Sequence, residues 1–200
     1  MCFLAAKYIQ MKSRTLTASF LVGIAAMIAV SCNDAAPENK VEATASETDV
    51  ERGKYLVETI GCDDCHSPKK MGARGPELIE DLRFSGYPQD RPVLKPDSNE
   101  VKKGWMVFAP DLTQAVGAWG VSFSANITSD STGIGGWTEE QFFKAMREGK
   151  SKGLDNTRPM LPPMPWQNFA KLKDADLKAM FAYLKSTKPV RNIVPAPVSL

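Results

Sequence analysis

Residues 62–66 read Cys-Asp-Asp-Cys-His, a set of residue types at a spacing that could attach a haem covalently. Two thiols one helical turn apart can add across the two vinyl groups of one porphyrin. The adjacent His66 would then supply an axial nitrogen to the iron. Because His66 is the one histidine in the sequence, a haem held by two histidines of this chain is excluded, as is a second haem attached in the same way. We therefore predict one covalent haem, bonded to Cys62 and Cys65.

Two other interpretations of the cysteine pair have less support. A structural zinc site needs four ligands, usually in two separated pairs. The sequence holds no second pair of cysteines or histidines at the spacing of zinc ligands. A redox dithiol of the thioredoxin kind would lie in a βαβ pattern, which the surrounding residues lack. Haem attachment is the prediction that remains.

The sixth iron position would fall to methionine, lysine, a weak oxygen ligand or nothing. Residues 158–166 read Arg-Pro-Met-Leu-Pro-Pro-Met-Pro-Trp, so Met160 and Met164 lie among four prolines. Proline fixes φ and excludes helix, which lets this loop hold a thioether in one place at little entropic cost. Met106 and an open site are the further alternatives. Trp137 could donate its indole N–H to a haem propionate, although packing alone would also explain it.

The N-terminal residues predict export and a lipid anchor. A short basic stretch is followed by the apolar run 16–30, which suits a signal peptide better than a membrane span. The run ends in Ala-Val-Ser before Cys32, similar to a lipoprotein cleavage box. We predict a signal peptide at 1–32 cleaved before Cys32, a flexible tether at 33–48 and a location on the periplasmic side of a bacterial membrane. Translation could start at Met1 or at Met11.

The charge of the chain excludes one class of partner. The formal net charge is +2, but three of the basic residues lie in the predicted leader, so the mature chain would be about −1. No basic stripe with interleaved aromatic residues is present, so we predict no nucleic-acid binding.

One compact domain is predicted at 49–190, followed by a loosely packed tail at 191–200. Helices are expected from Asp49 towards the haem motif, after a capping box at Thr138 and Gln141, and from Asp174 to about Lys185. Between 74 and 137 the periodicity disappears, with short β-type pieces at 106–108 and 121–123. We expect this stretch to wrap the haem irregularly, with room for small hairpins but without a real sheet.

Together these features resemble class I c-type cytochromes, and most closely the cytochrome modules of membrane-bound dehydrogenases. Those modules carry segments similar to residues 125–138 and 173–186, and a Met-Pro-aromatic element like the one that begins at Met164. The resemblance implies an all-α class I cytochrome c fold, with a long irregular haem-wrapping insertion between the haem motif and the later helices. Dehydrogenase cytochrome subunits usually hold several haem domains, whereas this chain has one attachment motif.

The resemblance also implies roles for single residues. Met164 would be the axial ligand in preference to Met160. Gly53 would lie against the C-terminal helix near Tyr183. The carbonyl of Pro76, in a Gly-Pro-x-Leu sequence, would accept the Nδ1–H of His66 and orient the ring.

These observations predict an electron carrier with haem c as its cofactor and no small-molecule substrate. Its partners would be redox proteins: a periplasmic or membrane dehydrogenase or a quinol-oxidising complex as donor, and a downstream acceptor such as a terminal oxidase. The alternative function is a catalytic or gas-binding haem of the peroxidase kind, with a displaceable sixth ligand.

Overall fold

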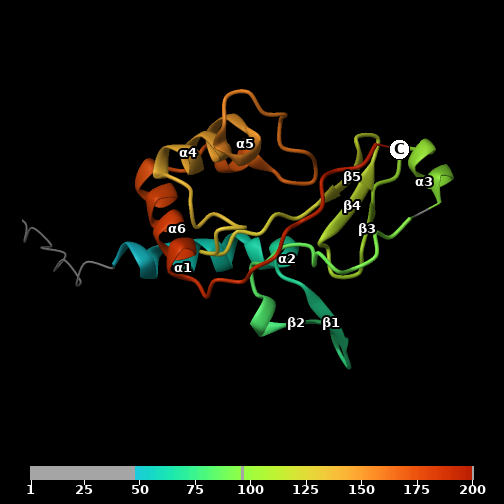
Figure 1. Cartoon of the computed structure of the whole chain (residues 1–200), viewed down its shortest axis with the longest axis horizontal. Helices are drawn as coiled ribbons and strands as arrows, with labels where there is room; N and C mark the ends of the chain where they lie inside the picture. The colour runs from blue at the N-terminus through green and yellow to red at the C-terminus, as the bar shows by residue number, and fades with distance from the viewer. Residues whose placement is uncertain (1–47, 96, 200) are drawn as a thin grey trace, which may run out of the picture. The chain divides into compact units, whose positions relative to one another are not determined.

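The computed structural model describes residues 48–95 and 97–199. Its helical elements are α1 (Asp49–Ile60), α2 (Cys62–His66), η1 (Glu80–Leu82), α3 (Ser98–Lys102), α4 (Glu139–Glu148), η2 (Ser151–Gly153), α5 (Trp166–Phe169) and α6 (Asp174–Ser186). Its strands are β1 (Lys69–Gly72), β2 (Gly75–Leu78), β3 (Val107–Phe108), β4 (Gln114–Gly117) and β5 (Gly120–Phe123) (Figure 1). The predicted leader and tether, with Cys32, lie outside the described residues.

The first two helices are joined by one glycine. Thr48 and Glu51 form a capping box at the start of α1, in which each side chain accepts a hydrogen bond from the other residue's backbone N–H. Gly61 ends the helix in the left-handed region at φ 83°, where residues with a side chain are disfavoured. Because α2 starts at the next residue, the haem motif is held directly on the end of α1.

The helices α1 and α6 cross at Gly53. A Cβ atom at this position would overlap the backbone carbonyl of Ala179 and come within 2.8 Å of the Cβ of Tyr183. The expectation that small Gly53 permits this contact is confirmed.

A core of apolar side chains holds α1, α4 and α6 together. Val57 and Leu177 are fully buried, and the ring of Phe84 meets that of Tyr183 edge to face at a centroid distance of 6.2 Å. Met146 and Met180 lie in this core, as expected of methionines on apolar helix faces. Thr138 and Gln141 form the predicted capping box of α4, and Gly149 ends that helix in the left-handed region.

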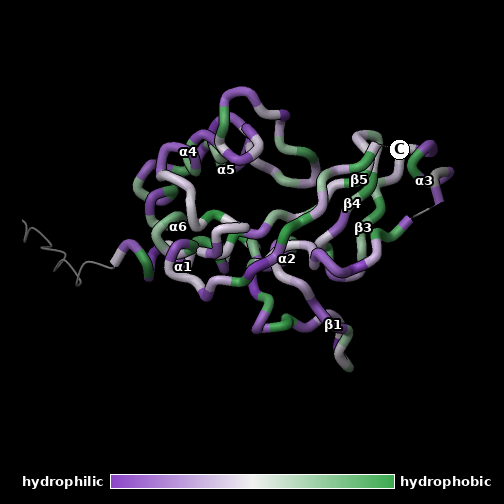
Figure 2. The backbone as a smooth tube through the Cα atoms, viewed as in Figure 1, coloured by the Kyte–Doolittle hydropathy of each residue, from purple (hydrophilic) through white to green (hydrophobic). Residues whose placement is uncertain are grey.

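The insertion between the haem motif and α4 contains more regular structure than we expected. Strands β3, β4 and β5 form an antiparallel sheet in that order, with Val107 opposite Val116 and Ser122 opposite Ala115. Apolar residues gather on this sheet as they do on α6 (Figure 2). The expectation of no real sheet was wrong, and "all-α" is too narrow a description. Every residue of β4 is buried, so this strand lacks the alternation of polar and apolar residues that reveals a half-buried strand.

The tail at 191–200 is also better packed than we expected. The buried Asn192 side chain donates hydrogen bonds to the carbonyls of Ser85 and Tyr87 at 2.6 and 2.9 Å, and accepts one from the N–H of Gln89. Val198 then pairs with Val121 of β5. Among the described residues, no helix has the length and hydropathy needed to cross a membrane.

Candidate haem site

Helix α2 presents the two cysteines and the histidine of the predicted attachment motif. Cys62 and Cys65 lie three positions apart on one helical turn, and both thiols are free and partly buried. Burial raises the pKa of the Cys62 thiol to about 12, with a further contribution from the negative charge of Asp63. Burial also raises the pKa of Cys65.

The raised thiol pKa values argue against a redox dithiol. Reactive dithiol motifs lower the pKa of the attacking cysteine, so that it is a thiolate near neutral pH. Here burial shifts the pKa of both thiols in the opposite direction, upward. The described residues contain no group of three or more histidine, cysteine or acidic side chains placed to hold a metal ion.

The imidazole of His66 is oriented by a backbone carbonyl from the insertion. Its Nδ1 lies 2.7 Å from the carbonyl oxygen of Ala125. Since a carbonyl can only accept, Nδ1 carries the proton and Nε2 keeps its lone pair. Burial lowers the pKa of His66, which favours the neutral ring that an iron ligand requires.

The structure thus gives His66 a different partner from the one we expected. Pro76 lies exposed in β2, opposite Met71 in the β1–β2 hairpin, and its carbonyl makes no hydrogen bond to His66. Ala125 belongs to the segment 125–138, which resembles dehydrogenase cytochromes. Nothing in the sequence assigned this segment a role at His66, and the expected carbonyl of Pro76 does not take that role here.

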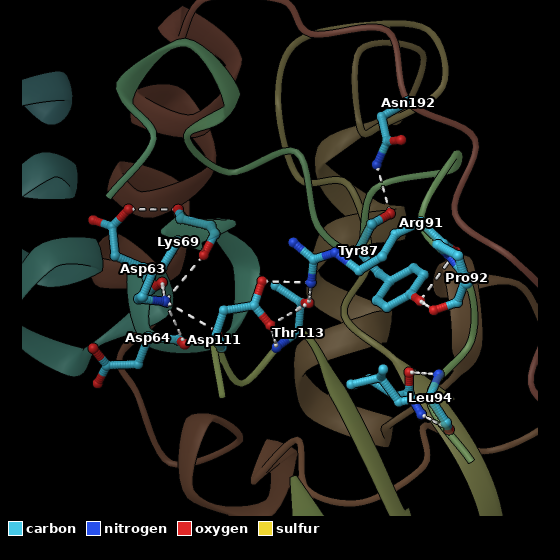
Figure 3. A network of polar contacts seen from close by, with 12 residues as sticks. Asp63, Asp64, Lys69, Tyr87, Arg91, Pro92, Leu94, Asp111, Thr113 and Asn192 are labelled. Carbon is cyan, nitrogen blue, oxygen red and sulfur yellow. Dashed lines mark hydrogen bonds and ion pairs between the residues drawn. The ribbon is translucent and has the colours of Figure 1, made fainter. Parts of the chain in front are cut away.

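Lys69 secures the end of the motif helix, a role that the sequence did not suggest. Its ammonium group donates to the carbonyls of Asp63, Asp64 and Ser67 at 2.9, 2.8 and 3.0 Å, and lies 3.3 Å from that of Asp111. A cation at this position satisfies carbonyls that the end of a helix leaves without partners. Figure 3 shows the Lys69 side chain reaching from the motif towards Asp111 in the insertion.

Two ion-pair clusters fix the surroundings of α2. Arg83 binds Asp63 at 2.6 Å and Glu58 at 3.0 Å. In the insertion, Arg91 binds Asp111 at 2.6 Å (Figure 3). Because Asp63 is in the motif and Asp111 contacts Lys69 through its carbonyl, the two clusters tie the motif to the chain that follows it.

The two candidate methionine ligands differ in their surroundings. Met164 is partly buried and packs against the core cluster that Cys62 and Trp137 also contact. Met160 lies outside that cluster, and its N–H donates to the carbonyl of Gly149. Met106 is 54% exposed in the insertion. Of the three methionines, Met164 is thus the one that packs on the core cluster.

Trp137 is the residue that we predicted to contact a haem propionate. Its ring packs on the same core cluster as Met164, and its indole N–H donates to no group within the described residues. The contact itself stays a prediction.

The chemistry of these side chains fits a covalently bound haem. Cys62 and Cys65 would form the thioethers, and Nε2 of His66 and the sulfur of Met164 would be the ligands to the iron. The imidazole is already held in the tautomer that such ligation requires, and neither thiol is consumed in a disulfide.

A small apolar core with the two terminal helices crossing at a glycine, together with the Cys-x-x-Cys-His helix, defines a class I cytochrome c. The sequence comparison agrees. The family model described as "Cytochrome c" matches residues 50–188. The chain belongs to the cytochrome c family, and its cofactor is covalently bound haem c.

Among curated proteins, the chain is similar to cytochrome subunits of dehydrogenases. It is 29% identical over 163 residues to the gluconate 2-dehydrogenase cytochrome c subunit of Pantoea cypripedii, covering 78% of this chain and 28% of that protein. It is 28% identical over 174 residues to the fructose dehydrogenase cytochrome subunit of Gluconobacter japonicus, covering 83% and 28%. It is 42% identical over 80 residues to the cytochrome c subunit of the quinone-type alcohol dehydrogenase of Gluconobacter oxydans, covering 39% and 16%. The chain thus spans less than a third of the length of each of these relatives.

Proposed function

We propose that this chain is a single-electron carrier, with one haem c held by Cys62, Cys65, His66 and Met164. The observation that carries the proposal is the orientation of the His66 imidazole. His66 is fixed by the Ala125 carbonyl with its Nε2 lone pair available, and the Met164 thioether packs on the core cluster that Cys62 also contacts. When bound, the haem supplies an iron that cycles between two oxidation states, and a histidine–methionine pair raises its potential relative to harder ligands.

The residues of the chain would keep that iron closed to substrates. Cys62 and Cys65 prevent loss of the haem, and the Ala125 carbonyl holds the His66 ring in one orientation. The prolines around Met164 restrict its backbone, so the thioether is held near its working position in both oxidation states. An iron with two fixed axial ligands has little to reorganise and no vacant position for a substrate.

We propose a dehydrogenase as the electron donor, because the relatives are named as cytochrome subunits of dehydrogenases. A quinol-oxidising complex is the other donor we considered, and a terminal oxidase is the acceptor we propose. One Cys-x-x-Cys-His motif in the whole sequence supports one haem per chain. The lipid anchor at Cys32, on the periplasmic side of a bacterial membrane, belongs to the same proposal and rests on the sequence alone.

Two measurements test the carrier function: carbon monoxide binding to the reduced protein, and electron transfer to an acceptor followed by rapid mixing. The reduced protein should bind carbon monoxide slowly or not at all, and should pass its electron rapidly to an oxidised small-protein acceptor such as a soluble cytochrome c. Met164→Ala should bind carbon monoxide rapidly, whereas the matched variant Met160→Ala should behave like the wild type. Rapid binding of carbon monoxide by the wild type would instead support the gas-binding or peroxidase-like alternative.

A separate test addresses the anchor. The wild-type protein should fractionate with membranes and carry acyl groups on Cys32 in intact mass analysis. Cys32→Ser should be recovered in the soluble periplasmic fraction with its haem retained. An unacylated wild-type protein would contradict the anchor without affecting the electron-carrier proposal.

A further inference from the structure

The sheet formed by β3, β4 and β5, which we call the insertion sheet, contacts the loop between η2 and α5 that carries Met164. The contact is made by a buried side chain. Ser122 of β5 is 7% exposed, and its Oγ donates to the carbonyl of Pro162 at 2.7 Å. Pro162 precedes Met164 by two residues. The loop between η2 and α5 and the strand β5 can be followed in Figure 1.

The hydroxyl of Ser122 is directed by a second donor. The indole Nε1 of Trp119 lies 3.1 Å from Ser122 Oγ. An indole N–H can only donate, so it occupies a lone pair of the hydroxyl and leaves the hydroxyl proton for another acceptor. Two carbonyls are within reach, Pro162 at 2.7 Å and Ala115 at 3.4 Å, and the shorter contact is the stronger one.

The backbone between Pro162 and Met164 is stiff, so fixing the position of Pro162 also restricts the position of Met164. Residues 162, 163 and 165 are all proline, so their φ angles are fixed. On its other side, the carbonyl of Met164 accepts from the N–H of Trp166 at 3.0 Å. The Trp166 ring lies against Gly149, where a Cβ atom would overlap it. Met164 is thus held between Ser122 and Trp166.

The same stretch of chain also reaches the other axial ligand. Three residues after Ser122, the carbonyl of Ala125 accepts from Nδ1 of His66 at 2.7 Å. Ser122 therefore contacts the loop that carries Met164, and Ala125 contacts His66 itself; we call these two residues the axial brace.

We propose that Ser122 is a positioning residue for the sixth ligand: its hydrogen bond to Pro162 holds the Met164 thioether in place, so that the insertion sheet controls how readily an outside ligand displaces it. This inference rests on the proposed ligation by Met164. It assigns to the insertion a role beyond covering the haem.

Competition by imidazole tests the proposal. Imidazole added to the oxidised protein displaces a bound thioether, and the far-red absorption band of methionine–iron ligation disappears as it does so. Ser122→Ala should bind imidazole about tenfold more tightly than the wild type, because a buried hydrogen bond of this kind contributes on the order of a factor of ten. Ser122→Thr, which keeps the hydroxyl, should restore most of the wild-type affinity.

A matched control separates positioning from general stability. Ser124→Ala makes the same change two residues along the chain, outside the brace, where the side chain has no hydrogen bond within the described residues, and should leave the imidazole affinity unchanged. Trp119→Phe keeps the Ser122 hydroxyl but removes its indole donor, and should tighten imidazole binding by about threefold. If Ser122→Ala loses stability to denaturant yet binds imidazole within twofold of the wild type, the positioning role is overturned.

Met164→Ala distinguishes failure of this inference from failure of the proposed ligand set. Loss of the far-red band in Met164→Ala, with wild-type imidazole affinity in Ser122→Ala, would overturn the brace and leave Met164 as the ligand. Retention of the band in Met164→Ala would overturn the ligand assignment and the inference with it.

Discussion

Gly53 in α1 lies directly against the carbonyl of Ala179 in α6, with no space between them for a β-carbon. The contact brings together the two helices that begin and close the haem domain. We expect Gly53→Ala to lower the free energy of unfolding by about 3 kcal/mol, because the helices must separate to admit a methyl group. Denaturant titration of the haem-loaded protein measures the change.

Gly136→Ala is the matched control for that substitution. Nothing lies within 4 Å of a Cβ atom at Gly136, so this change should alter the free energy of unfolding by less than about 0.5 kcal/mol. Equal stability of the Gly53→Ala and Gly136→Ala proteins would show that the helix crossing is not tight in solution.

Asp63 should make stability depend on pH in the acidic range. Burial alone would raise the pKa of Asp63, but hydrogen bonds from Arg83 and Ser67, with the charge of Arg83, hold it below its usual value. Because the folded-state pKa is the lower one, the carboxylate stabilises the fold above the unfolded-state pKa of about 4. That contribution is lost as the pH falls through the folded-state pKa.

Asp63→Asn should therefore cost about 2 kcal/mol in the free energy of unfolding at neutral pH. The difference between wild type and variant should shrink as the pH is lowered below about 4. Asp64→Asn is the control, since the exposed Asp64 side chain forms no ion pair among the described residues. A difference for Asp63→Asn that is the same at neutral and acidic pH would contradict the assignment.

Lys69→Gln should weaken the end of α2. The substitution removes a cation that donates to the carbonyls of Asp63, Asp64 and Ser67. We expect the free energy of unfolding to fall by about 2 kcal/mol. We also expect the midpoint potential to fall, because losing a positive charge three residues from His66 favours the oxidised iron.

Lys70→Gln provides the comparison for Lys69→Gln. Lys70 is the next residue along β1, is exposed, and donates to no group within the described residues. The same loss of charge there should change stability and potential much less. If both variants shifted the potential equally, net charge alone would explain the effect and the position of Lys69 would not matter.

Local signals in the sequence predicted the helices well. The capping box at Thr138 and Gln141, the stop at Gly149 and the apolar face of α6 are each determined by residues close to one another in the sequence. Gly53 was identified through the resemblance to a family, and the structure explains that glycine by the backbone of Ala179.

Long-range pairings were not predictable in the same way. The hydrogen bond from His66 to Ala125 joins residues 59 positions apart. Which carbonyl lies next to the His66 ring therefore depends on the path of the whole insertion. Strand β4 was missed because it is buried on both faces. Its Gln114 is accommodated by two hydrogen bonds to the backbone of Leu94, a pairing that composition does not reveal.

The attachment of haem to this chain can be measured directly. Mature protein purified from a host that makes c-type cytochromes should be extracted with acidified acetone, and the haem left on the polypeptide quantified as its pyridine haemochrome. We predict one haem per chain with the haemochrome spectrum of two thioether bonds, and no retained haem in the Cys62→Ser, Cys65→Ser double variant. Wild-type protein whose haem is removed by the solvent would contradict the account.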